Sequence, residues 1–453
     1  MARTAGTAPQ PFQQLVTVEE ARERILARIA PLPPRRRPLL EALGLVLAEP
    51  IRASEPVPPF TNSAMDGYAV RAADTAGASP AHPVILRVVG DAPAGSASMR
   101  PRAANPATQE LPPHTAVRIM TGAQLPPGAD AVVRFEDTDE VEASPLPAPR
   151  EFVRIRRPVQ PGENVRPAGE DIAAGSLVLE PGTLLQPAHL GLLAALGRSW
   201  VLVHPRPRVA ILATGDEIVP PDQPLLPGQI RNTNSIVLAG LVLQSGGIPH
   251  LIGIASDHDA DLERRVTYAR GADLILTSGG VSQGDYDRVK EFLRQRGRFE
   301  IWQVRIKPGK PMAFGAIDET PVIALPGNPV ASVVAFLQFV RPAIARLLGR
   351  TDLAPPRVRA ILTQTVDNRG QRRHFVRARL DTRAGTSVVT PVPNQGSGVL
   401  TGLAHANCLA IIPEDWAEAP AGSEVEVELL DLTAFPPTVP FLTVTGRAGY
   451  QPT

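Results

Sequence analysis

A glycine-rich segment, Thr277-Ser-Gly-Gly-Val-Ser-Gln-Gly-Asp-Tyr-Asp287, combines backbone flexibility with hydroxyl and carboxylate groups. It follows the apolar run 273–277 and precedes the helix-like stretch 286–296, so it is predicted to be a strand-to-helix turn. Glycines allow such a turn to bring its N–H groups close to an anion, and the N-terminus of the following helix adds positive potential. The pattern matches neither a Walker A loop nor a dinucleotide fingerprint, and a purely structural turn is the alternative explanation. The residues expected to contact an anion are Thr277, Ser278, Gly279, Gly280, Ser282 and Gly284.

Carboxylates accompany this turn and two other predicted strand ends. Asp285 and Asp287 close the glycine-rich segment, Glu217 ends the run Ala213-Thr-Gly-Asp-Glu217, and Asp257 follows the apolar residues 251–255. A carboxylate beside a bound phosphate repels it unless a divalent cation lies between them, and Mg²⁺ prefers oxygen ligands. We therefore predict a Mg²⁺ site formed by Glu217, Asp257 and Asp287. Asp285 and Asp287 can each cap the helix that follows, and either could be the ligand.

Two further turns carry groups that suit an anionic ligand. Lys307-Pro-Gly-Lys-Pro311 places the cations Lys307 and Lys310 around a turn whose prolines exclude regular structure. It is either a solvated basic loop or, next to the glycine-rich turn, a source of positive charge for a ligand with several negative charges. Leu325-Pro-Gly-Asn-Pro329 is a second strand-to-helix turn. Its Pro326, Asn328 and Pro329, together with exposed N–H groups, are expected to face the ligand.

A separate β-rich segment contributes three polar motifs: Ser63-Ala-Met-Asp-Gly-Tyr-Ala-Val70, residues 119–133, and residues 161–171. Asp66-Gly67 is typical of a turn, Thr121 follows an apolar run, and Asp171 closes the third motif. Neither a Ser/His/Asp nor a Cys/His arrangement is evident. Covalent nucleophilic catalysis is therefore not expected.

The periodicity of the chain predicts several domains of different composition. Residues 17–30 form an amphipathic helix opened by the capping-box pair Thr17 and Glu20. Strands alternate with helices in the region 187–350, which predicts a parallel sheet with ligands at the carboxyl ends of its strands. The fold class is therefore multidomain α/β plus β. The predicted parts are a discontinuous domain of residues 12–55 and 154–186, a β-rich inserted domain 56–153, the α/β domain 187–350, a C-terminal β-barrel 356–432 and a tail 433–453.

Composition excludes several classes of protein. The 453 residues carry 46 Lys+Arg and 45 Asp+Glu, so no overall field attracts nucleic acid or an anionic membrane. Apolar stretches are interrupted by Gly, Pro or charge, so a membrane span is not expected, and the polar N-terminus lacks the apolar core of a signal peptide. A single cysteine, Cys408, excludes an internal disulfide and a cysteine metal cluster. A cytoplasmic protein fits these features best.

Taken together, the motifs resemble those of molybdopterin molybdenumtransferase, the molybdenum insertase that also forms the C-terminal part of gephyrin. The resemblance extends over residues 12–432 and depends on the order of eight motifs. They are residues 63–70, 119–133, 161–172, 214–217, 277–287, 307–311, 325–329 and 395–398.

This resemblance implies an elongated homodimer with four domains per subunit. The implied reaction is the Mg²⁺-dependent transfer of molybdate onto adenylylated molybdopterin, with release of AMP. It further implies contacts with the adenylyltransferase that makes the substrate and with apo-molybdoenzymes. By motif, the functional polar residues are Asp66, Thr121, Asp171, Glu217, Asp257 and Asp287. Lys307 and Ser397 correspond to anion contacts, and Asp66 and Thr121 are expected to serve the partner subunit's nucleotide loop.

One departure from the family pattern and two alternatives remain at this point. Some members have an additional Lys where this chain has Gln303, with Arg305 nearby as a substitute charge. A molybdopterin adenylyltransferase of the same fold is one alternative, but that enzyme resembles the central domain alone. A gephyrin-like scaffold is the other, but this chain lacks the additional adenylyltransferase-like domain and long linker expected there.

Overall fold

The computed structural model describes residues 15–95, 100–101, 110–140, 151–256, 258–279, 295, 297–430 and 442–443. The chain divides into two compact units. The first comprises residues 1–49, 181–187 and 200–453, and the second comprises residues 50–180 and 188–199. Each unit has its own hydrophobic core and is described by itself.

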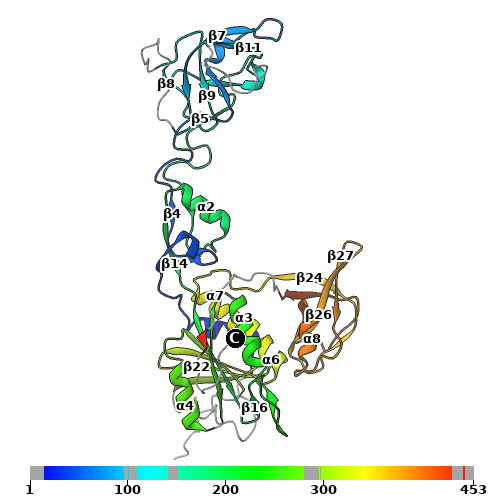
Figure 1. Ribbon diagram of the computed structural model, residues 1–453. Coiled ribbons are helices and arrows are strands. Elements are labelled where there is room, and N and C mark those ends of the chain that lie inside the picture. The colour runs from blue at the N-terminus through cyan, green and yellow to red at the C-terminus, as the bar shows by residue number, and fades with distance from the viewer. Residues whose placement is uncertain are drawn as a thin grey trace, which may run out of the picture. The chain divides into compact units, whose positions relative to one another are not determined.

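The centre of the first unit is an eight-stranded sheet, of which β22 is labelled in Figure 1. The order of its strands is β1-β20-β22-β23-β19-β15-β18-β31. Its strands are β1 (Leu15–Val16), β15 (Arg208–Thr214), β18 (Ile248–Ala255), β19 (Leu274–Ser278), β20 (Gly297–Val304), β22 (Pro311–Ile317), β23 (Thr320–Leu325) and β31 (Leu442–Thr443). All neighbouring pairs are parallel, as predicted, except that β22 pairs antiparallel with both β20 and β23. The short turn between β22 and β23 explains this exception, because a parallel crossover needs a dozen or more residues.

Helices cover both faces of this sheet. They are α1 (Val18–Leu26), α3 (Asn234–Gln244), α4 (Asp259–Tyr268), α6 (Pro329–Ala335), the π-helical turn η4 (Phe336–Val340) and α7 (Arg341–Leu347). Alternate strand residues face opposite ways. Ile211 and Leu276 therefore pack with α1, α3 and the α6–α7 run, whereas Ala210 and Ile275 pack with α4. The predicted capping box of Thr17 and Glu20 is present at α1.

The run Pro329–Leu347 is a core helix. It has the length and hydropathy of a membrane span, but 89% of its most apolar stretch is buried within the protein. Arg341 and Pro342 interrupt this run, as expected, but they do not lower its mean hydropathy below that of a membrane span. It is the only described helix that meets the length and hydropathy of a span.

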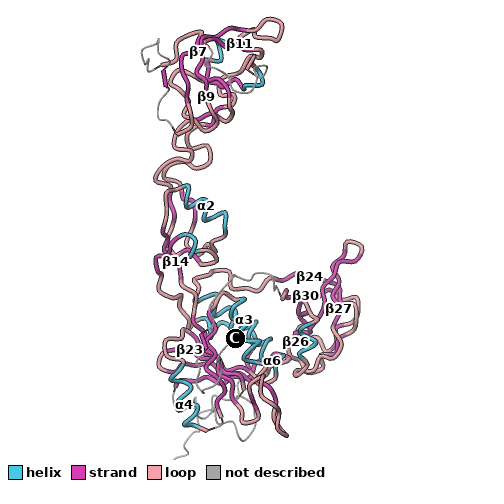
Figure 2. The backbone as a smooth tube through the Cα atoms, in the orientation of Figure 1, coloured by secondary structure: helices cyan, strands magenta, loops and turns pink. Residues whose placement is uncertain are grey.

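Five strands close into the predicted C-terminal β-barrel (Figure 2). They are β24 (Arg357–Leu362), β26 (Arg373–Arg383), β27 (Thr386–Pro391), β28 (Cys408–Ile412) and β30 (Glu424–Leu429). Pairing of β26 with β28 completes the ring, and β21 (Ile306–Lys307) joins the barrel in parallel with β26. Helix α8 (Leu400–Ala404) precedes β28, and β25 (Val366–Asp367) pairs with β29 (Glu418–Ala419). The buried Cys408 lies in the barrel core, as expected for a free cysteine.

Besides the β25–β29 pair, the described part of the first unit contains two further small sheets. Strand β14 (Trp200–His204) pairs with β2 (Arg35–Pro38) and β3 (Val46–Leu47) next to η1 (Leu39–Ala42). Strands β16 (Ile218–Val219) and β17 (Ile230–Arg231) form a short parallel pair.

The second unit is rich in β-structure, as predicted. Its main sheet has the order β10-β6-β9-β7-β11, with β8 attached to β7. The strands are β4 (Ile51–Arg52), β5 (Asn62–Ser63), β6 (Gly67–Val70), β7 (Val84–Ala92), β8 (Arg100–Pro101), β9 (Thr115–Ile119), β10 (Ala131–Arg134), β11 (Phe152–Ile155), β12 (Val165–Arg166) and β13 (Leu177–Leu179). Helix α2 (Pro187–Ala195) lies at the boundary of the two units in the sequence.

Candidate functional site

The carboxyl ends of three neighbouring strands bring predicted motifs to one edge of the sheet. Strands β15, β19 and β23 are adjacent and parallel, with Ser278 in register with both Ala213 and Leu325. The Gly279 N–H donates to the Leu325 carbonyl at 3.2 Å. Thr277, Ser278 and Gly279 therefore lie beside the turn that contains Pro326 and Asn328.

Gly279 must be a glycine at this position. Its φ is +100°, and a Cβ added there would lie 2.9 Å from both the carbonyl oxygen and Oγ1 of Thr214. Thr214 in turn donates from Oγ1 to the Ser278 carbonyl at 3.4 Å. Gly279 is therefore needed because its backbone lies close to Thr214. Both an anion-binding turn and a purely structural turn would require a glycine here.

Asn234, at the start of α3, connects two of these turns and was missed in the sequence analysis. Its Nδ2 donates to Ser278 Oγ at 2.7 Å and to the Gly327 carbonyl at 2.8 Å. The available signal was the polar run 231–235, which directly precedes an apolar stretch in the sequence.

Glu217 is the one predicted metal ligand whose surroundings the structure describes. Its carboxylate lies against Gly215, where an added Cβ would be 2.6–2.8 Å from the carboxylate atoms. This places an acidic oxygen at the end of β15, which suits an oxygen-preferring cation. Asp257 and Asp287 lie outside the described residues, as do Gly280, Ser282 and Gly284. The described part of the chain contains no cluster of three or more His, Cys, Asp or Glu suited to a metal.

The turn with two lysines packs against the start of α6. Gly309 has a φ of +114°, and a Cβ there would be 3.3 Å from the Ala331 carbonyl oxygen. Burial lowers the pKa of Lys307; the neighbouring Arg372 acts in the same direction, and Asp367 opposes it. Lys310 lies on the same turn, where its carbonyl accepts the Val304 N–H at 2.9 Å.

The loop containing Ser397 reaches the same helix from the barrel. The Val330 N–H donates to the Ser397 carbonyl at 3.0 Å. Pro329 has no N–H and the Val330 N–H is bonded to Ser397, so neither of these two residues offers a free N–H group to a ligand. Asn328 and Gly327 remain exposed.

Arg377 holds the Ser397 loop in place, and it too was missed. Its guanidinium, almost fully buried, donates to the carbonyls of Gly396 at 3.1 Å and Val399 at 2.9 Å. A third bond reaches the Asn394 carbonyl at 3.1 Å. An arginine in the middle of a barrel strand gave no signal of this role, because its acceptors come from another segment of the chain.

In the second unit, Asp66 and Thr121 lie in direct contact. Asp66 Oδ1 accepts the Thr121 N–H at 2.7 Å and the Thr121 hydroxyl at 2.8 Å. These two hydrogen bonds, aided by Arg118, lower the pKa of Asp66. Asp171 lies on another loop, where its N–H donates to the Val57 carbonyl at 3.0 Å.

Arg118 connects this pair to a buried cluster in the same unit. Its guanidinium binds Glu140 Oε1 at 2.9–3.0 Å and lies 4.8 Å from the Phe135 ring centroid. Tyr68 also donates to Glu140 and packs edge-on against Phe135. The rigid cluster supports the strands from which Asp66 and Thr121 project.

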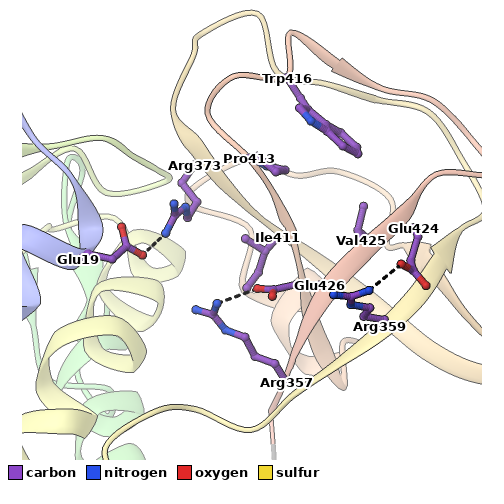
Figure 3. A pocket seen from close by; sticks show the side chains of 10 residues that line it. All are labelled: Glu19, Arg357, Arg359, Arg373, Ile411, Pro413, Trp416, Glu424, Val425 and Glu426. Carbon is purple, nitrogen blue, oxygen red and sulfur yellow. Dashed lines mark hydrogen bonds and ion pairs between the residues drawn. The ribbon is translucent and has the colours of Figure 1, made fainter.

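A cavity of about 510 Å³ lies elsewhere in the first unit, between the start of α1 and the barrel (Figure 3). Three arginines line it, but each is paired: Arg373 with Glu19, Arg357 with Glu426, and Arg359 with Glu424. None of the predicted site residues lines this cavity. The described candidate residues of the first unit lie instead near the strand ends and the start of α6.

The fold defines a multidomain α/β protein in which a loop of the C-terminal barrel contacts the start of a helix that follows a mixed, mostly parallel sheet. Family models match three consecutive regions of the chain. They are the MoeA N-terminal region (domain I and II) over residues 16–197, a probable molybdopterin binding domain over 210–346, and the MoeA C-terminal region (domain IV) over 359–430.

Individual relatives agree with these matches. A molybdopterin molybdenumtransferase 2 of Mycobacterium tuberculosis is 44% identical over 400 residues, covering 86% of this chain and 93% of the relative. The molybdopterin molybdenumtransferase of Haemophilus influenzae is 36% identical, covering 91% and 98%. A solved molybdopterin biosynthesis MoeA protein from Pyrococcus horikosii superposes with a TM-score of 0.76 at 33% identity, covering 92% and 100%. The chain belongs to the molybdopterin molybdenumtransferase family.

Proposed function

We propose that this transferase of molybdenum cofactor biosynthesis inserts molybdate into adenylylated molybdopterin, with Mg²⁺ present and AMP released. One observation carries the proposal beyond family membership. Four segments distant in sequence meet around the start of α6 and the neighbouring strand ends: residues 277–279, 307–310, 325–329 and 395–398. They combine hydroxyls, amides and two lysines, which are groups suited to an anionic substrate.

Positive charge is needed because both substrates are anions that repel each other. Lys307 and Lys310 provide fixed cations, and the neighbouring turns provide backbone dipoles. Hydrolysis of the phosphoanhydride adds water across one P–O bond, so AMP leaves with its phosphate and the water's proton passes to a carboxylate. Glu217, Asp257 and Asp287 would hold the Mg²⁺, which when bound would polarise the phosphoanhydride. The dithiolene sulfurs belong to the substrate, which is consistent with the absence of a reactive cysteine near the described site.

Asp66 and Thr121 are proposed to act in a homodimer in the cytoplasm. Their exposed side chains are ordered by one another, although they belong to a separate compact unit. In such a dimer, the Asp66–Thr121 pair of one subunit would contact the nucleotide loop of the partner subunit and take part in catalysis there, as the family resemblance implies. Contacts with the adenylyltransferase and with apo-molybdoenzymes belong to the same proposal.

The decisive experiment mixes the purified protein with adenylylated molybdopterin, Mg²⁺ and molybdate. We expect molybdate-dependent release of AMP and transfer of active cofactor to an apo-molybdoenzyme. AMP release that does not depend on molybdate, or no release at all, would contradict the proposal.

Asp287 can be tested against its neighbour Asp285. Asp287→Ala is expected to reduce AMP release by at least about a hundredfold, because a lost metal ligand removes charge stabilisation in the transition state. Asp285→Ala serves as the matched control and should retain activity, with circular dichroism confirming the fold of both. The reverse result would transfer the metal-ligand role to Asp285.

A further inference from the structure

The long helix behind the site contains a proline at a position where an α-helix cannot accommodate it. Pro342 has no N–H to donate to the carbonyl of Gln338, and its ring would collide with that carbonyl. The chain responds with the π-helical turn Phe336–Val340, in which the Arg341 N–H donates to the Phe336 carbonyl. The Gln338 carbonyl then needs a donor from outside the helix.

Arg22 of α1 supplies that donor. Its Nε donates to the Gln338 carbonyl at 3.0 Å, and its Nη2 donates to Gln338 Oε1 at 2.8 Å. Arg22 therefore connects α1 to both the main chain and the side chain of Gln338.

The other end of the Gln338 side chain binds the barrel. Its Nε2 donates to Glu428 Oε2 at 2.9 Å, and Arg341 donates to Glu428 Oε1 at 2.8 Å. Both Gln338 and Glu428 are completely buried. The Gln338 amide accepts from Arg22 and donates to Glu428 at once, whereas an ionised Glu at position 338 has no donor for Glu428 and Met has neither group.

The same helix binds the barrel a second time, at the site. Val330, near its N-terminus, donates to the Ser397 carbonyl, and the Ser397 loop comes from the barrel. Glu428 lies on barrel strand β30, so the two contacts hold one barrel at two points along one helix. Displacement at Glu428 must therefore move or strain the Ser397 contact.

We propose that Gln338 is a positioning residue for the reaction. Through Arg22 and Glu428 it sets the barrel on the α6–α7 helix so that the Ser397 loop meets the start of α6. The role of the loop in molybdate transfer rests on the function proposed above, whereas the mechanical coupling from Gln338 to Ser397 does not.

The test is a reciprocal exchange of the two buried side chains. Gln338→Glu sets two carboxylates against each other and should speed amide hydrogen exchange at Val330 and raise the KM for molybdate, each on the order of tenfold, with a smaller change in kcat. The double variant Gln338→Glu with Glu428→Gln restores one donor and one acceptor and should recover both values. Where Gln338→Glu does not fold, Gln338→Met, which removes the bonds without adding charge, is measured in the same way.

Glu424→Gln is the matched control, because it removes an exposed carboxylate from the same strand and its partner Arg359 is also exposed (Figure 3). It should leave hydrogen exchange at Val330 unchanged. Unchanged exchange in a folded Gln338 variant, or a double variant that folds without recovery, would overturn the coupling. A wild-type protein without molybdate-dependent AMP release would instead contradict the proposed function, since the hydrogen-exchange result stands by itself.

Discussion

At the scale of single residues, Asp66 is a carboxylate ordered by its neighbour and left exposed. The two hydrogen bonds from Thr121 favour the ionised form and fix its orientation. Because the pair is exposed, substitutions in it should change the free energy of unfolding little. They would still affect a reaction that uses the negative charge of Asp66.

Asp66→Asn is therefore expected to lower kcat by about tenfold or more while the thermal unfolding midpoint changes little. The amide oxygen can still accept from Thr121, so the charge is the principal change. Rates of AMP release and a thermal melt measure the two quantities. Thr121→Val, which removes only the hydroxyl donor, is the companion variant, and full activity of Asp66→Asn would remove Asp66 from the catalytic set.

The buried His374 is expected to make the stability of the protein depend on pH. Burial lowers its pKa to about 3, with Lys307, Arg372 and Arg377 acting in the same direction and Asp367 opposing them. Its Nδ1 is buried and has no hydrogen-bond partner among the described residues. Between about pH 6.5 and pH 3 the unfolded chain therefore binds a proton that the native protein does not, so stability falls as the pH falls through this window.

Replacing His374 with Gln removes this difference. The wild-type protein should lose up to about 1.4 kcal/mol of unfolding free energy per pH unit from this one group, and the variant should lose correspondingly less. Denaturant unfolding at pH 7.5 and pH 5.5 gives the comparison. Equal pH dependence in both proteins would contradict the lowered pKa of His374 in the native state.

At the scale of elements, strand ends and helix starts meet through Asn234. One amide holds the β19 turn and the β23 turn together, so α3 positions both. Asn234→Asp removes the donor and adds negative charge where an anion is proposed to bind.

We expect this change to raise the substrate KM on the order of tenfold. Asn232→Asp introduces the same charge two residues earlier and keeps the oxygen that accepts the Ser235 N–H at 3.1 Å. An equal rise in KM for both variants would mean that the added charge, and not the loss of the two hydrogen bonds of Asn234, controls binding.

A second element, strand β6, depends on a glycine. A Cβ at Gly67 would lie 2.0 Å from the Val133 carbonyl oxygen, at the end of the β6–β10 pairing where Gly67 faces Arg134. Gly67→Ala should destabilise the second unit by about 2–4 kcal/mol, because two backbones must separate. Limited proteolysis and denaturant unfolding would detect it, whereas Gly77→Ala, at an open position, should cost less. Similar stability for the two variants would contradict the argument.

At the scale of the whole molecule, exposed apolar side chains gather in one short stretch. Leu225, Leu226, Ile230 and Ile236 are each more than two-fifths exposed. Surface groups of this kind often mark an interface, and the proposed homodimer offers an occupant.

Light scattering after size-exclusion chromatography should give twice the 48.2 kDa mass of the chain. Leu226→Asp is expected to shift the equilibrium toward the monomer, because a buried unpaired charge weakens an interface. A monomeric wild-type protein would contradict the dimer, and an unaffected dimer would exclude this surface.

Much of this protein follows from local patterns in its sequence. The alternation of strands and helices predicted the α/β domain, and the short strand-like runs after Pro355-Pro356 predicted the barrel, because periodicity is a local property. The boundaries of the four predicted domains stay a prediction.

Tertiary structure alone decided the contacts between distant segments. Asn234 stands in a polar run that does not indicate its partners, and Arg377 gave no local signal, since the acceptors of both lie far away in the chain. Pro342 was visible in the sequence, but its effect depended on Arg22 approaching the Gln338 carbonyl. A sequence pattern specifies which backbone groups lack a partner, whereas only the folded chain brings the donor that satisfies them.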